Sequence, residues 1–126
     1  MFDFSLSKVS KVAIITFSGT ISFDDTLSYE KQRKVIEKAF NISNLSGIVC
    51  IINSPGGSPV QAELIFKKIQ MMATKRKVPV ITYIEDIGAS GGYYLAIAGD
   101  NIYASNSSVI GCIGVISSGF GFHELI

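Results

Sequence analysis

The sequence is poor in the side chains that most often bind metal ions. Its 126 residues include one histidine, His123, and two cysteines, Cys50 and Cys112. Both cysteines lie inside apolar runs and lack metal-ligand spacing, so we interpret them as buried thiols that act as small hydrophobic side chains. Such thiols are consistent with a reducing compartment. We therefore expect no metal site and no cofactor.

An excess of charge of one sign is also missing. Eleven basic and ten acidic side chains give a net charge of +1, and no basic stripe with interleaved aromatic residues is present. We therefore expect no nucleic-acid partner. The basic cluster of Lys75, Arg76 and Lys77 is interpreted as the solvated end of a helix, where positive charge complements the helix dipole.

Long hydrophobic runs are absent as well. The apolar runs are far shorter than a membrane span, and residues 1–10 contain no apolar core of a signal peptide. We expect a cytoplasmic protein that would need a missing segment or a partner to associate with a membrane. Apolar residues nevertheless make up 48% of the chain. This share indicates a surface buried against another subunit or a strongly buried parallel sheet.

The apolar runs that are present predict one α/β domain. A chain of this length fits a single domain. Apolar and β-branched runs predict strands at residues 12–17, 47–53, 78–84, 101–104 and 109–116. Helical segments separate most of these runs, and this alternation predicts a parallel sheet with covering helices.

Capping residues and apolar faces define the predicted helices. The first begins at a cap among residues 24–26 and ends near Phe40. The second has Ser58 as its N-cap, a proline in its first turn and Gln61 as capping-box partner, and it ends near Lys75. The predicted apolar faces are Val35, Ile36, Ala39 and Phe40 in the first helix, and Val60, Ala62, Ile65, Ile69, Met72 and Ala73 in the second.

Glycines flank a serine where the third predicted strand turns into a short helix that stops at Gly99. Residues 88–92 read G-A-S-G-G and match the pattern G-x-S-x-G. Such a corner exposes a hydroxyl beside the unpaired N–H groups of a helix start, and acyl transfer needs both. We therefore consider Ser90 a candidate nucleophile. Five residues alone also describe an ordinary turn.

A second glycine loop, S-P-G-G-S-P, occupies residues 54–59 between a strand and a helix. It lacks the lysine and the glycine spacing of the phosphate-binding loops. A backbone N–H in this loop, such as that of Gly57, is suited to stabilise a developing oxyanion. An ordinary turn is the alternative.

A serine nucleophile needs a base, and the sequence leaves its identity open. Ser90, Asp100 and His123 follow the order of an α/β-hydrolase triad. Asp100 is equally a turn residue after a helix, however, and His123 lies at a predicted helix start on the surface. Every lysine precedes Ser90, and most lie on charged helix faces, where a lysine stays protonated. Glu85 and Asp86 either help to align the site or merely end a strand, and we favour the second interpretation.

Three motifs in this order resemble the signal peptide peptidase A family of serine proteases. They are NSPGGS at residues 53–58, GASGGYYLA at 88–96 and VIGCIGVI at 109–116, and the final GFGFHELI resembles the SohB-type branch. The resemblance extends from residue 12 to residue 126. It implies a ClpP/crotonase-like α/β fold of repeated β-β-α units with a mostly parallel sheet. Residues 1–126 would then form a single peptidase domain that is truncated at its C-terminus.

The resemblance also implies an active site and a partner. Its nucleophile is Ser90, and its oxyanion donors are the N–H of Gly57 and a further N–H near Gly91. The Ser–Lys dyad of the family would draw its lysine from beyond Ile126, which would leave the isolated chain inactive or nearly so. Family members form homo-oligomers and cleave extended apolar peptides such as released signal peptides. In this chain the peptide contacts would be Gly56, Gly57, Ile113 and Gly114.

Two other functions fit the same fold. A non-catalytic peptide-binding or assembly module would take up extended peptides by adding them to strand edges. An acyl-CoA enzyme of the crotonase type would use the glycine N–H groups for an enolate. That chemistry does not need a serine between the glycines, so it is the weaker alternative.

Overall fold

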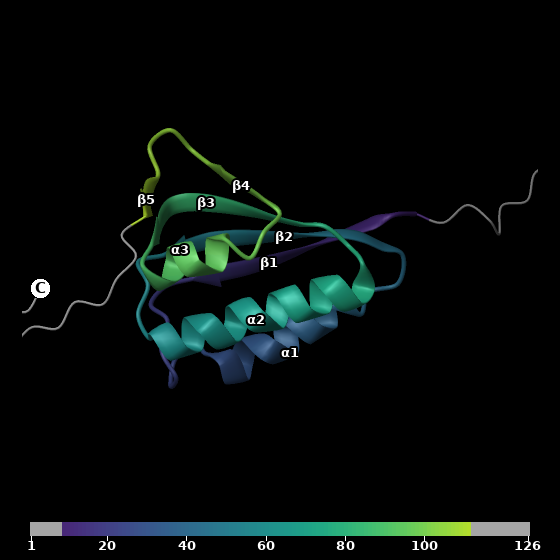
Figure 1. The fold of residues 1–126 in the computed structure, drawn as a ribbon, viewed down its shortest axis with the longest axis horizontal. Coiled ribbons are helices and arrows are strands. Elements are labelled where there is room, and N and C mark those ends of the chain that lie inside the picture. Colours follow the sequence, from purple (N-terminus) through teal and green to yellow (C-terminus); the bar gives the residue numbers. More distant parts are fainter. Residues whose placement is uncertain (1–8, 112–126) are drawn as a thin grey trace, which may run out of the picture.

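The computed structural model describes residues 9–111. In this range the chain forms a parallel sheet with helices packed against one of its faces (Figure 1). All strand pairings in this range are parallel, as the sequence predicts. The strands are β1 (Lys11–Ser18), β2 (Leu45–Ser54), β3 (Val80–Ala89), β4 (Asn101–Ala104) and β5 (Val109–Gly111). The helices are α1 (Tyr29–Phe40), α2 (Pro59–Arg76) and α3 (Gly91–Ala96).

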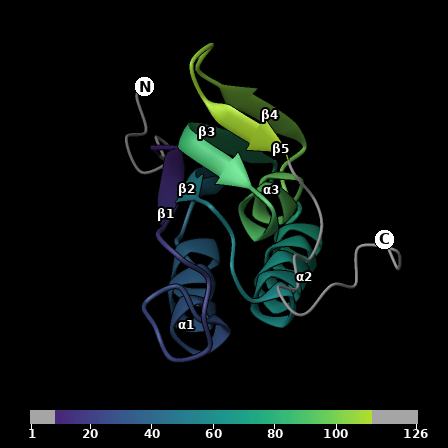
Figure 2. The ribbon, with the colours of Figure 1, turned by 90° about the vertical axis from the view of Figure 1, so that its left-hand side faces the viewer.

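The strand order is β1-β2-β3-β4, and β5 pairs with the last part of β3. Seen from its end, the sheet has α1, α2 and α3 on the same side (Figure 2). Alternate side chains of β1 point to that side and are buried: Ala13, Ile15 and Phe17. The predicted strands are confirmed within the described range, whereas residues 112–116 of the fifth lie outside it.

The first helix begins later than predicted. Its N-cap is Ser28, whose hydroxyl accepts a hydrogen bond from the N–H of Lys31. The prediction of a cap among residues 24–26 is wrong because those side chains bond within their own loop. Asp24 accepts from the hydroxyl of Ser22, and Asp25 accepts from the N–H and hydroxyl of its neighbour.

The second helix begins as predicted, with Ser58 accepting from the N–H of Gln61. The expected return bond of a capping box is absent, because the Gln61 side chain instead accepts from the N–H of Tyr29 at 2.8 Å. The N–H of Ser58 donates to the carbonyl of Ile21. Gln61 therefore caps the start of α1 rather than the start of its own helix.

The predicted apolar faces are correct at their centres and wrong at two margins. Val35 is 46% exposed, and Val60 is 62% exposed. Val35 lies about 100° around the helix from the fully buried Ile36, which is enough to turn it to solvent. The buried faces are Ile36, Ala39 and Phe40 in α1, and Ala62, Ile65, Ile69 and Met72 in α2.

Polar side chains of α2 bind α1 at both ends and in the middle. Besides Gln61 at the start, Lys68 forms an ion pair with Glu37 at 2.8 Å. At the far end Arg76 donates to the carbonyl of Phe40, the last residue of α1, and to that of Ile42 just after the helix. A carbonyl in the last turn of a helix has no partner within the helix. The interpretation of Arg76 as part of a solvated helix end is therefore wrong.

We expect Arg76→Met to lower the free energy of unfolding by about 1–3 kcal/mol, because two partly buried carbonyls lose a charged donor. The variant keeps most of the apolar stem. Lys75→Met, one residue away on the exposed face, is the matched control and should stay within about 0.5 kcal/mol of the parent. Urea unfolding of all three proteins measures the difference, and equal costs for the two variants would contradict a capping role.

Candidate active site

Ser90 lies at the corner between β3 and α3, as the sequence predicts. It is the N-cap of α3, with φ +53° and ψ −121°. A residue with a side chain rarely adopts a positive φ, and such strain costs about 1–3 kcal/mol. A serine on a sharp, strained turn from strand to helix is the geometry of a nucleophile elbow.

Neighbouring backbone fixes this corner. The N–H of Ser90 donates to the carbonyl of Gly111 at 2.9 Å, and the carbonyl of Ser90 accepts from the N–H of Tyr94 at 3.0 Å. At Gly92 a Cβ atom would lie 2.2 Å from the carbonyl oxygen of Ser54. The end of β2 therefore packs directly against the start of α3. Because Gly91 and Gly92 open the helix, their N–H groups have no partners within it.

The two glycine loops meet at Gly56. This buried residue has φ +105°, and a Cβ atom on it would lie 2.8 Å from both the Ser90 Cβ and the Gly91 nitrogen. A side chain at Gly56 would therefore occupy the space that separates the loops. The structure brings Gly56 to Ser90 and Gly91, although it lies more than 30 residues before them in sequence.

The backbone around Gly57 is held so that its own N–H points outward. Ile21 donates to the carbonyl of Gly56 and accepts from the N–H of Ser58, both at 2.8 Å. This parallel bridge between Ile21 and Gly57 turns the polar groups of Gly57 away from Ile21. The N–H of Gly56 donates to the Ser54 hydroxyl. Gly57 is exposed, and its N–H has no hydrogen-bond partner within residues 9–111.

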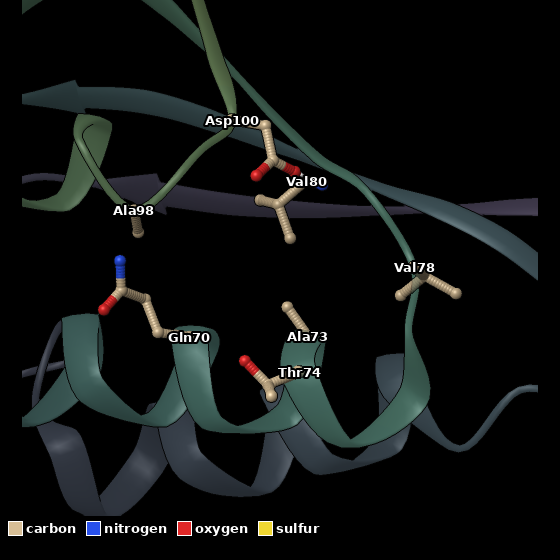
Figure 3. A pocket seen from close by; sticks show the side chains of 7 residues that line it. All are labelled: Gln70, Ala73, Thr74, Val78, Val80, Ala98 and Asp100. Carbon is tan, nitrogen blue, oxygen red and sulfur yellow. Dashed lines mark hydrogen bonds between the residues drawn. The ribbon is translucent and has the colours of Figure 1, made fainter.

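Asp100 is not brought to Ser90. Its N–H donates to the carbonyl of Val80 and its carboxylate accepts from the N–H of Val80, at 2.7 and 2.8 Å. Val80 begins β3, whereas Ser90 follows the end of the same strand. Asp100 instead lines an open cleft of about 400 Å³ with Gln70 and Thr74 of α2 (Figure 3). A triad that uses Asp100 is therefore wrong.

The remaining predicted site residues, His123, Ile113 and Gly114, lie outside the described residues. The candidate lysine bases lie elsewhere in the fold. Among the lysines, Lys67 forms an ion pair with Glu63 at 2.6 Å. That carboxylate raises the pKa of Lys67, so the amine stays protonated and is unsuited to act as a base.

The roles of two polar residues at the start of the second glycine loop, Asn53 and Ser54, were missed by the sequence analysis. Asn53 accepts from the N–H of Ile87 and donates to Asp86, both at 3.1 Å. Ser54 is buried and holds the N–H of Gly56. The expectation that Asp86 and Glu85 merely end a strand is wrong, because both lie within β3. The signal was available, since the asparagine and the serine end an apolar strand and only Pro55 separates them from the glycines.

Other chemistry is limited in the described residues. Burial raises the pKa of the Cys50 thiol to about 12, so the thiol stays protonated as a small apolar group. Residues 9–111 contain no group of three or more potential metal ligands. No helix in the described part of the chain is long and apolar enough to span a membrane.

Comparison with protein families places this site in a known context. Residues 72–126 match the model of peptidase family S49. The chain is 45% identical over 114 residues to the Na(+)/H(+) antiporter NhaA of Brucella abortus, covering 90% of this chain and 15% of that protein. It is 39% identical over 123 residues to the chloroplastic serine protease SPPA of Arabidopsis thaliana, covering 91% of this chain and 18% of that protein. The chain thus spans less than a fifth of either relative.

Solved structures show the same fold. A serine-to-alanine variant of the 1510-N membrane-bound stomatin-specific protease superimposes with a TM-score of 0.67 at 22% identity, over 91% of this chain and 54% of that one. A lysine-to-alanine variant of the same protease, in complex with a substrate peptide, gives a TM-score of 0.64 at 23% identity. The second match covers 88% of this chain and 49% of that one.

The contact between the glycine loops generates a stability prediction. We expect Gly56→Ala to cost about 1–3 kcal/mol more in the free energy of unfolding than Gly19→Ala. Both glycines have positive φ, +105° and +96°, but a Cβ atom at Gly19 meets nothing within 4 Å. Gly19→Ala therefore measures backbone strain alone, and the excess measures the clash with Ser90 and Gly91. Chemical unfolding of both variants tests this, and similar costs would contradict the close approach.

Proposed function

The chain is part of a serine protease domain of peptidase family S49, of the signal peptide peptidase A and SohB type, and on this premise we propose that Ser90 is its nucleophile. The observation that supports the proposal is the close approach of Gly56 to the Ser90 corner, because Gly57, whose N–H points away from Ile21, directly follows Gly56. A strained, half-buried serine beside outward-pointing N–H groups suits acyl transfer.

In this mechanism the Ser90 hydroxyl oxygen attacks the carbonyl carbon of a peptide bond. Negative charge develops on the carbonyl oxygen, and the N–H groups of Gly57 and Gly91 stabilise it. The N–H of Ser90 does not contribute, because it donates to Gly111. The base passes the proton taken from Ser90 to the leaving nitrogen, so collapse of the tetrahedral intermediate expels the amine and leaves an acyl-enzyme on Ser90, which water then hydrolyses.

We assign the general base to a lysine outside residues 9–111. Such a base accepts the Ser90 proton only if desolvation or nearby positive charge lowers its pKa. The described lysines do not offer that environment. Lys67 is in an ion pair with Glu63, which raises the pKa of its amine, and Lys68 is held by Glu37 at 2.8 Å. A lysine from another segment or another subunit completes the dyad.

The proposed substrate is an extended apolar peptide, such as a released signal peptide, cleaved within a homo-oligomer. One structural relative is described as bound to a substrate peptide, which supports the class of ligand. In this chain the loop of Gly56 and Gly57 would contact the peptide backbone, together with Ile113 and Gly114. The transport activity named for the Brucella relative gives no argument here, because the chain covers 15% of that protein.

A fluorophosphonate probe tests the nucleophile in the full-length gene product. We expect covalent labelling at Ser90 and a loss of labelling and peptide hydrolysis of about 10³-fold or more in Ser90→Ala. Ser107→Ala, at an exposed serine of the loop between β4 and β5, is the control and should label as the parent does. A folded protein that binds apolar peptides but is never labelled would support the non-catalytic module instead.

Asp100→Asn separates the dyad from a hydrolase-type triad. The variant keeps an acceptor for the N–H of Val80, so we expect hydrolysis within about twofold of the parent. An acid that orients a catalytic histidine behaves differently, since its replacement by the amide lowers kcat by about 10⁴-fold. The turnover of a peptide ester by the variant and by His123→Ala measures this, and a loss of that size in both would restore the triad.

A further inference from the structure

Strand β3, which leads to Ser90, contains two more residues than β2 between two successive registered pairs. Ile52 of β2 pairs with Ile84 of β3, and the next registered pair is Ser54 with Gly88. One residue of β2, Asn53, therefore lies opposite three residues of β3, numbers 85–87. Such a bulge interrupts the ladder and redirects the strand that carries it, and bulges are common beside active sites.

Asn53 supplies the hydrogen bonds that the interrupted ladder lacks. Its side-chain oxygen accepts from the N–H of Ile87, and its side-chain nitrogen donates to the Asp86 carboxylate, both at 3.1 Å. On the other side of the bulge, the Ser108 hydroxyl lies within hydrogen-bond distance of the carbonyls of Ile84 and Glu85. Two side chains thus hold the bulge from both neighbouring segments.

The position of Asn53 connects this bulge to the second glycine loop. Its own carbonyl accepts from the N–H of Gly19 at 2.9 Å, which ties the end of β2 to the end of β1. Ser54 follows directly and holds the N–H of Gly56. Ile87 lies three residues before Ser90. A shift of the Asn53 side chain would therefore change the separation between Ser90 and the N–H of Gly57.

We propose that Asn53 is a positioning residue that sets the distance between the Ser90 hydroxyl and the oxyanion donor Gly57. It does so through the hydrogen bonds of its side-chain amide to the Ile87 N–H and the Asp86 carboxylate. This inference rests on the proposed function, because it concerns the same nucleophile. The proposed role of Asn53 is to set a distance and not to supply a charge. Two further polar side chains, Tyr83 and Glu85, share a cleft of about 240 Å³ with Asp86.

An exchange of the two side chains tests the proposal in the full-length gene product near neutral pH. Asn53→Asp keeps an acceptor for Ile87 but sets a second carboxylate against Asp86, so we expect fluorophosphonate labelling of Ser90 to slow by about 10- to 100-fold. Asp86→Asn keeps an acceptor for Asn53 and should label within about twofold of the parent. The double variant restores one amide and one carboxylate and should regain most of the rate.

Asn106→Asp makes the same substitution in the exposed loop between β4 and β5 and controls for added charge. Asn53→Ser removes both bonds without adding charge, and it should slow labelling and speed hydrogen exchange at the Ile87 amide. Labelling rates are measured per folded molecule. If Asn53 were merely structural, its replacement would lower the melting temperature but leave the reactivity of the folded protein unchanged.

The outcomes separate the two proposals. If the parent is not labelled at all, the assignment of Ser90 as nucleophile fails. If the parent is labelled and folded Asn53→Ser reacts equally fast, the positioning role is overturned, whether or not Asn53→Asp folds. A double variant that folds but stays as slow as Asn53→Asp also overturns it.

Discussion

The close approach of Gly56 to the Ser90 corner constrains the rest of the structure. A Cβ atom at Gly56 would lie 2.8 Å from the Gly91 nitrogen and the Ser90 Cβ, so the loops after β2 and β3 meet without intervening side chains. Parallel strands make this possible, because the segments that leave their carboxyl ends emerge at the same edge of the sheet. The site is therefore built almost wholly from backbone, and glycine is required for space and for positive φ.

The strain at Ser90 has to be offset by the packing of α3, and both ends of this short helix are anchored. At its start, Gly92 lies against the carbonyl of Ser54. At its end, the buried hydroxyl of Thr82 in β3 donates to the carbonyl of Ala96 at 2.7 Å. Leu95 is fully buried between these points. An anchored helix cannot turn to relax φ at its N-cap, so the serine remains in its strained conformation.

Local signals in the sequence were sufficient for the strands, for the Ser58 cap and for the serine corner, because each depends on neighbouring residues. Apart from the cap of α1, where residues 24–26 bond within their own loop, the polar side chains that were misassigned bond far along the chain. Gln61 caps a helix 32 residues away, and Asp100 bonds to a strand start 20 residues away. The amide of Asn53 belongs to the same class, since its partners are more than 30 residues distant. Pairings of this kind depend on register, and the two extra residues in β3 have no periodic signature.

The arrangement separates the parts of acyl transfer that need exact geometry from the part that needs a tuned pKa. The proposed nucleophile and oxyanion donors must be fixed within a fraction of an ångström, and they follow the ends of the adjacent strands β2 and β3. A lysine base instead needs a desolvated environment, and a flexible side chain reaches its target from a separate segment. Because Gly56, Gly57 and Ser90 are set by residues between Ile21 and Gly111, their geometry does not depend on the base. In the proposed mechanism, the sheet thus prepares the oxyanion site, and the environment of the proposed lysine determines when the serine becomes reactive.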